Sequence, residues 1–66
     1  MNPKAIGRRL VELRGIKTGD EVSKALGISR SALCMYETGE RIPRDPIKIK
    51  IANYYNKTVQ ELFFDD

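Results

Sequence analysis

The chain has 66 residues, and its 12 Lys and Arg against nine Asp and Glu give a formal net charge of +3. A chain of this length forms one domain with one small core, which leaves little room for a catalytic cleft. The sequence contains no His and a single Cys, which argues against zinc fingers, Cys-His proteases and disulfide scaffolds. We therefore expect one domain over residues 1–66 with no enzymatic activity, no cofactor and no metal.

The apolar segments, the single thiol and the charge distribution indicate the cellular compartment and the kind of partner. No apolar run approaches the roughly 20 residues of a membrane span, and the first ten residues have no uncharged apolar stretch typical of a leader. A single free thiol suits a reducing compartment. We expect a cytoplasmic protein without membrane contact. Residues 1–17 carry five basic residues and one acidic residue, a distribution that permits a polyanionic partner.

The first helix is predicted from Pro3 to about Arg14. Asn2 is a suitable cap before a proline in the first helical position. One helical face carries the apolar residues Ile6, Leu10 and Leu13. A short connector of residues 15–17 follows.

Residues 19–38 have the pattern of a helix-turn-helix motif. Two short apolar faces, formed by Val22 and Leu26 and then by Leu33 and Tyr36, lie on either side of Gly27. Glycine adopts the left-handed conformation that ends a helix. The hydroxyls of Thr18 and Ser29 are suitable caps for the two helices.

The second helix of the motif, about residues 30–38, has a polar outer stripe made of Arg30, Ser31, Cys34, Met35 and Thr38. Such a helix suits the DNA major groove. Arg30 is the leading base-contacting residue, because guanine presents two acceptors that match a guanidinium; the alternative is an exposed arginine that binds phosphate or nothing. Ser31, Met35 and Cys34 complete the expected base-contacting set. Cys34 as a redox switch is disfavoured, because no neighbouring base activates it.

The loop after this helix is basic and contains Pro43, which indicates irregular structure. Arg41 and Arg44 are the leading phosphate-contacting residues, with simple solvation as the alternative. The expected phosphate-contacting set is completed by residues at the helix ends: Thr18, Gly19, Ser29 and Thr38.

Residues 45–51 alternate apolar and polar side chains, which is typical of a strand. We favour a helix to about Tyr55, because a single strand would have no pairing partner and Asp45 with Pro46 makes a good helix start. Its apolar face is Ile47, Ile51, Ala52 and Tyr55. Asn56 is expected in a left-handed turn, and Thr58 with Glu61 forms a capping box for a last helix through Phe63.

The predicted core gathers the inward-facing apolar residues of all these helices. It consists of Ile6, Leu10, Leu13, Val22, Leu26, Ile28, Leu33, Tyr36, Ile47, Ile51, Tyr55, Val59 and Leu62. Met35 is left outside this set, so a buried Met35 would contradict the predicted orientation of the helix over residues 30–38.

Several segments in register resemble one known family. These are residues 26–30 (LGISR), Tyr36-Glu37-Thr38-Gly39 with the basic loop that follows, Ile51-Ala52, and residues 58–63 (TVQELF). They resemble the DNA-binding domain of the phage repressor and Cro family, also called the xenobiotic-response-element family of helix-turn-helix regulators. The resemblance implies an all-α, five-helix, lambda-repressor-like bundle. It also implies a structural ion pair between Arg14 and Glu37, with two exposed charges that contribute little to stability as the alternative.

The chain departs from the family pattern at Gly19, where relatives often place a glutamine that holds the DNA backbone, and its connector is about two residues shorter. One side-chain contact to DNA is therefore expected to be missing at this helix start.

The function that this resemblance implies is sequence-specific binding of double-stranded DNA and transcriptional regulation. One recognition helix covers few base pairs, so we expect a homodimer on a two-fold operator. Tyr54, Phe63 and Phe64 are candidates for the dimer interface, and packing of all three inside one monomer is the alternative. The alternative function is a helix-turn-helix protein-interaction module such as an antitoxin or adaptor.

Overall fold

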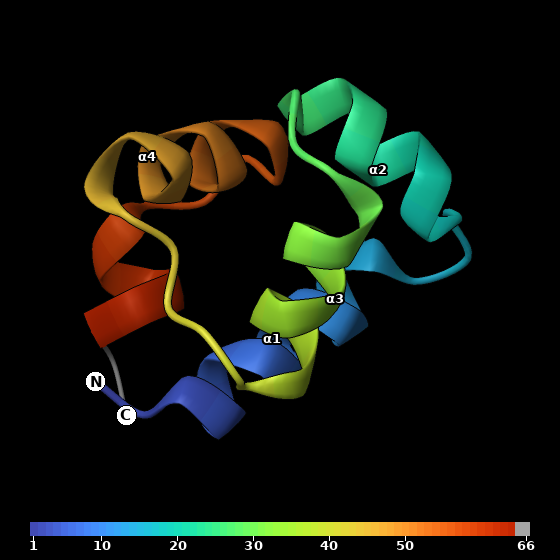
Figure 1. Cartoon of the computed structure of the whole chain (residues 1–66). Helices are drawn as coiled ribbons and strands as arrows, with labels where there is room; N and C mark the ends of the chain where they lie inside the picture. Colours follow the sequence, from blue (N-terminus) through green and yellow to red (C-terminus); the bar gives the residue numbers. More distant parts are fainter. Residues whose placement is uncertain (65–66) are drawn as a thin grey trace.

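The computed structural model describes residues 1–64, and all regular secondary structure in that range is helical (Figure 1). Its helices are α1 (Pro3–Arg14), α2 (Gly19–Leu26), α3 (Arg30–Thr38), α4 (Asp45–Tyr54) and the short η1 (Gln60–Phe64). The predicted all-α, five-helix fold is confirmed. Within residues 1–64, the helices are too short or too polar to cross a membrane.

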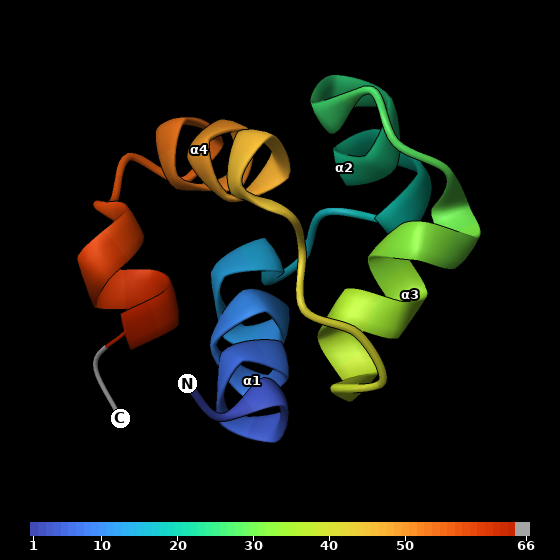
Figure 2. The same ribbon diagram turned by 60° about the vertical axis from the view of Figure 1, so that its left-hand side comes forward.

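Helix α1 lies between α3 and η1, and it packs against both (Figure 2). Helix α2 packs against α3 and also against α4. The two helices of the predicted helix-turn-helix motif, α2 and α3, are therefore held in place by their packing against α4 and α1.

The buried apolar residues form one cluster drawn from all five helices: Ile6, Leu10, Val22, Leu26, Leu33, Tyr36, Ile51, Ala52, Leu62 and Phe63. The other predicted core residues, Leu13, Ile28, Ile47, Tyr55 and Val59, pack against this cluster as partly buried side chains. Met35 is only half-buried, so the predicted orientation of α3 is confirmed.

The position of Phe63 differs from one of the sequence predictions. It was a candidate for the dimer interface, but its side chain has 0% exposure inside the monomer. Phe64, the next residue, is 47% exposed. Adjacent residues on a helix point in different directions, so only one of these two phenylalanines faces the core where η1 packs against α1.

Most of the predicted helix caps form. The Asn2 side chain accepts hydrogen bonds from the backbone N–H groups of Lys4 and Ala5, at 3.1 and 3.2 Å. The Thr58 hydroxyl accepts from the Glu61 N–H at 3.1 Å, and the Glu61 carboxylate accepts from the Thr58 N–H at 3.0 Å. Because these bonds join residues two or three apart, they depend on sequence more than on packing.

Helix α4 confirms the helical interpretation of the alternating segment, with one correction. Arg44 occupies the capping position and makes no side-chain cap bond, so the predicted cap at Asp45 is wrong. Asp45 instead lies in the first turn, where its carboxylate is 3.4 Å from the Lys48 ammonium. An acidic side chain in the first turn still interacts favourably with the helix dipole.

Lys48 itself is buried, with 7% exposure. Its ammonium nitrogen lies 5.9 Å from the centre of the Phe63 ring and 5.1 Å from that of Phe64, within the range of cation–π attraction. This contact joins α4 to η1.

Two further contacts join segments that are far apart in sequence. An Arg9 guanidinium nitrogen donates to the Leu62 carbonyl at 2.8 Å and ties η1 to α1. Gly7 lies where α1 crosses α3: a Cβ atom at this position would collide with the backbone carbonyl of Glu37 and lie 3.1 Å from the Tyr36 carbonyl oxygen. The absence of a side chain at Gly7 is what lets the two helices approach so closely.

Candidate DNA-binding interface

The turn between α2 and α3 forms as the sequence predicts. Gly27 has a φ of 68° in the left-handed region and ends α2. Ile28 packs against the core beneath the turn, and the Ser29 hydroxyl accepts from the Ala32 N–H at 3.0 Å to start α3. These interactions hold α3 at a set angle to α2 with its polar stripe facing outward.

The stripe on α3 is open to solvent. Arg30, Ser31, Cys34 and Thr38 are exposed and Met35 is half-buried. The structure thus brings the four predicted base-contacting residues, Arg30, Ser31, Cys34 and Met35, onto one accessible helix face. This surface offers a hydroxyl, a thiol and a thioether, which are groups suited to base edges and thymine methyl groups.

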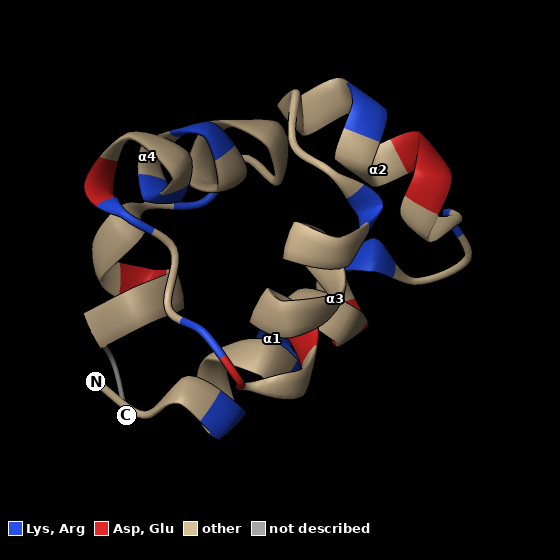
Figure 3. Ribbon diagram, in the orientation of Figure 1, with Lys and Arg blue, Asp and Glu red and all other residues tan. Residues whose placement is uncertain are grey.

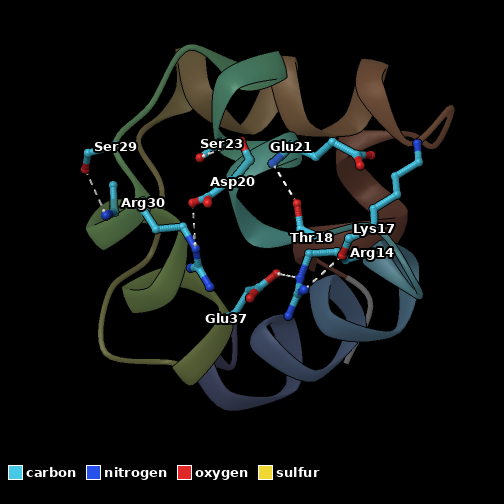
Figure 4. Close-up of polar contacts among 10 residues, drawn as sticks. Arg14, Lys17, Thr18, Asp20, Glu21, Ser23, Ser29, Arg30 and Glu37 are labelled. Carbon is cyan, nitrogen blue, oxygen red and sulfur yellow. Dashed lines mark hydrogen bonds and ion pairs between the residues drawn. The ribbon is translucent and has the colours of Figure 1, made fainter.

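The Arg30 side chain does not extend away from α3 but folds back over the start of α2 (Figure 4). Its Nε lies 3.7 Å from a carboxylate oxygen of Asp20, in an exposed ion pair. In Figure 3 a basic segment marks the start of α3 and acidic segments mark the first turn of α2. Asp20 is a partner of Arg30 that the sequence analysis did not identify.

The structure differs from the prediction of a phosphate contact at Gly19. It was expected to offer its backbone to a phosphate, but it is buried because the Arg30 guanidinium lies against it. In this conformation a DNA backbone has no access to Gly19.

The three hydroxyls among the predicted phosphate-contacting residues differ in what they can donate. The hydroxyls of Thr18 and Ser29 accept from backbone N–H groups at 3.1 and 3.0 Å, so each keeps its own hydrogen to donate. The Thr38 hydroxyl donates to the Met35 carbonyl at 3.3 Å. A hydroxyl has only one hydrogen, so Thr38 must release this bond before it can donate to a phosphate.

The loop after α3 is held at its start and in its middle. The N–H groups of Glu40 and Arg41 donate to the Met35 carbonyl at 3.0 and 3.3 Å, and Pro43 is buried. Arg41 and Arg44 are exposed on either side of this proline. The loop therefore presents two exposed guanidinium groups, which can contact phosphates, from a restrained backbone.

Arg14 and Glu37 form the ion pair that the family resemblance implies. Arg14 Nε donates to Glu37 Oε2 at 2.8 Å, and the Glu37 side chain is only 7% exposed. Arg14 Nη1 also donates to the Lys17 carbonyl at 3.0 Å. The pair connects the end of α1 to the end of α3 and to the connector before α2 (Figure 4).

Tyr55 lies near this pair and is a second feature that the sequence did not reveal. Its hydroxyl oxygen is buried without a hydrogen-bond partner among residues 1–64. Burial raises the pKa of Tyr55 to about 12, with Glu37 and Tyr54 adding to the rise and Arg14 opposing it.

Tyr54, the other aromatic residue at this end of α4, is partly covered. The Lys17 ammonium lies 4.8 Å from the centre of its ring and 3.3 Å from its hydroxyl. Of the three predicted dimer-interface residues, Phe64 is the one with a largely exposed side chain, at 47% exposure, although the Lys48 ammonium lies over its ring.

Comparison with known proteins agrees with this geometry. A model of the helix-turn-helix family matches residues 8–62, which include α2, α3 and most of the supporting helices. Searches of curated proteins and of solved structures gave no match. The matched range covers most of the chain and contains both helices of the motif, the basic loop and the Arg14–Glu37 pair. The chain belongs to the helix-turn-helix family of DNA-binding regulators, in the branch of the phage repressors and the xenobiotic-response-element proteins.

Proposed function

We propose that this domain binds double-stranded DNA sequence-specifically, with α3 in the major groove, and that it regulates transcription by occupying an operator. The observation that carries the proposal is the accessible face of α3, where Arg30, Ser31, Cys34 and Met35 lie together. A helix of this width and polarity fits the major groove.

In this proposal the residues around α3 bind the DNA backbone. Arg41 and Arg44 neutralise phosphates on one side, and the hydroxyls of Thr18 and Ser29 donate to phosphates at the starts of α2 and α3. Thr38 joins them when its bond to the Met35 carbonyl opens. These contacts set the position of α3, whereas its outer side chains read the bases.

The proposed operator has two half-sites. A single recognition helix discriminates too few base pairs to select one site in a genome, and a symmetric dimer with half-sites about one helical turn apart solves this problem. Phe64, 47% exposed, and Ile49, 54% exposed, line the same surface hollow. We place the dimer contact on this hollow.

Salt dependence of binding tests the proposal against the alternative, a protein-interaction module. The affinity of the wild type for random duplex DNA is measured over a range of salt concentrations. Phosphate neutralisation predicts a slope of about −0.9 in log affinity against log salt for each phosphate contacted. An absence of binding, or binding that does not change with salt, would contradict DNA binding and favour the interaction module. Selection of bound sites from random DNA then supplies the half-site and its spacing.

A further inference from the structure

The start of α2 is shaped around the Arg30 side chain. Gly19 is the first residue of α2, a position at the surface of the fold, yet it is buried. The group that covers it is the Arg30 guanidinium: a Cβ atom at residue 19 would collide with Cζ and Nε of Arg30 and lie 2.5 Å from its Nη2. The folded-back conformation of Arg30 therefore requires glycine at position 19.

Asp20 supplies the charge that opposes the guanidinium in this conformation. Its carboxylate lies 3.7 Å from Arg30 Nε, and the two side chains are 84% and 50% exposed, respectively. Ion pairs with this exposure are weak, and a cation above the first turn of a helix is disfavoured by the helix dipole. The arrangement holds Arg30 but releases it readily.

This conformation conflicts with base contact. A residue at the start of α3 reads a base edge by extending into the groove, whereas the guanidinium of Arg30 lies against α2 (Figure 4). Arg30 cannot occupy both positions.

We propose that Gly19 and Asp20 form a seat for the Arg30 guanidinium that competes with base contact, which makes residue 19 a specificity-determining position although it touches no base. This inference rests on the proposed DNA-binding function. The seat lowers the affinity gained from a guanine opposite Arg30, because that contact is made only after the guanidinium leaves Gly19 and Asp20.

Two substitutions should displace the Arg30 guanidinium from Gly19 and Asp20 in different ways. Gly19→Ala places a methyl group where the guanidinium lies, and only the flexible end of a side chain has to move, so the fold is retained. Asp20→Asn removes the opposing charge. Each is expected to bind a selected operator about two- to fivefold more tightly, the equivalent of an exposed ion pair, and to increase the preference for guanine at one base position.

The control variants distinguish a change at Arg30 from the general effect of removing a negative charge from α2. Glu21→Gln removes the same charge one residue further along α2, where the side chain points away from Arg30 (Figure 4); it is expected to improve binding to all sequences alike without changing base preference. In an Arg30→Ala background, Gly19→Ala should have no effect on affinity, and Asp20→Asn should match Glu21→Gln. Thermal unfolding by circular dichroism confirms that each variant is folded.

Two results would overturn the inference. One is weaker operator binding by Gly19→Ala, which would mean that the seat prepares Arg30 for DNA. The other is an effect of Gly19→Ala that persists without Arg30.

The seat can also be tested without DNA by NMR. The ¹⁵N resonance of Arg30 Nε should shift in Gly19→Ala and Asp20→Asn, and it should stay unchanged in Glu21→Gln. Unchanged resonances in all three variants would exclude the seat. A wild type that fails to bind DNA would refute the proposed function and the competition with it, whereas the Nε resonance still reports on the seat.

Discussion

The guanidinium of Arg14 and the carboxylate of Glu37, 23 residues apart in sequence, are joined by a 2.8 Å hydrogen bond at the place where α1 meets α3. Glu37 is 7% exposed and Arg14 23%, so the carboxylate depends on the arginine for its charge compensation. Removing one partner of such a pair leaves an uncompensated charge in a poorly solvated position.

We therefore expect the two residues to be energetically coupled. Arg14→Met and Glu37→Leu should each lower the free energy of unfolding, Arg14→Met by about 1 to 3 kcal/mol because it strands the buried carboxylate. The double variant should lose less than the sum of the single losses. Urea unfolding of the four proteins measures the coupling, and additive effects would exclude it. Arg8→Met, which removes an exposed arginine from the same helix, is a control expected within about 0.5 kcal/mol of the wild type.

The crossing of α1 and α3 depends on Gly7. Gly7→Ala should lower the free energy of unfolding by about 1 to 3 kcal/mol, because the added methyl group meets the rigid backbone of Glu37 and overpacking outweighs the better helix propensity of alanine. Gly19→Ala is the matched control: it adds the same methyl group to a helix but meets only the end of the Arg30 side chain. Chemical denaturation of both variants checks this prediction, and equal stabilities would contradict it.

Tyr55 predicts how stability changes at alkaline pH. Its pKa is raised from 10.0 to about 12 by burial, so the folded state favours the neutral phenol. This contribution to stability is complete below pH 10, the unfolded pKa, and is lost as the pH rises through the folded pKa near 12. Tyr55→Phe should therefore lose less stability than the wild type between pH 10 and pH 12.

At pH 7, Tyr55→Phe should be as stable as the wild type or more stable by up to about 1 kcal/mol, because it removes a buried hydroxyl without a partner. Tyr54→Phe is the comparison, since the Tyr54 hydroxyl accepts from Lys17; it should keep most of the alkaline loss of the wild type, because it removes only a lesser cause of the raised pKa of Tyr55 and leaves the burial of Tyr55 unchanged. Denaturant unfolding at pH 7, 10 and 11.5 distinguishes these outcomes. An identical alkaline loss in both variants would show that Tyr55 does not titrate in this range.

The proposed base and phosphate contacts predict two kinds of binding defect. Arg30→Ala should weaken operator binding by about 1 to 3 kcal/mol and relax the preference at one base position, because it removes a base contact. Arg41→Ala and Arg44→Ala should weaken binding to all sequences alike and reduce the magnitude of the salt slope by about 1 each. Fluorescence anisotropy with operator and scrambled duplexes at several salt concentrations measures both effects. Sequence-independent loss in Arg30→Ala would place this arginine on the backbone instead.

The sequence by itself determined the local structure of this domain. The caps at Asn2, Thr18 and Ser29, the left-handed Gly27 and the Thr58–Glu61 capping box all involve residues within five positions of each other, so their chemistry is visible in the sequence. Helical periodicity likewise identified the buried faces of α1 to α4 and the open face of α3. The Arg14–Glu37 pair was found from a family resemblance, because no local signal joins two residues 23 positions apart.

The tertiary structure decided which of several equivalent side chains are buried or paired. Phe63 and Phe64 are alike in sequence, and only the packing of η1 against α1 buries the first. The bond from Arg9 to Leu62 spans 53 residues, and the burial of Lys48 depends on two rings from another helix. Arg30 folds back because the start of α2 lies within its reach. The free energy of such contacts arises only when distant segments meet, so no pattern within a single helix reveals them.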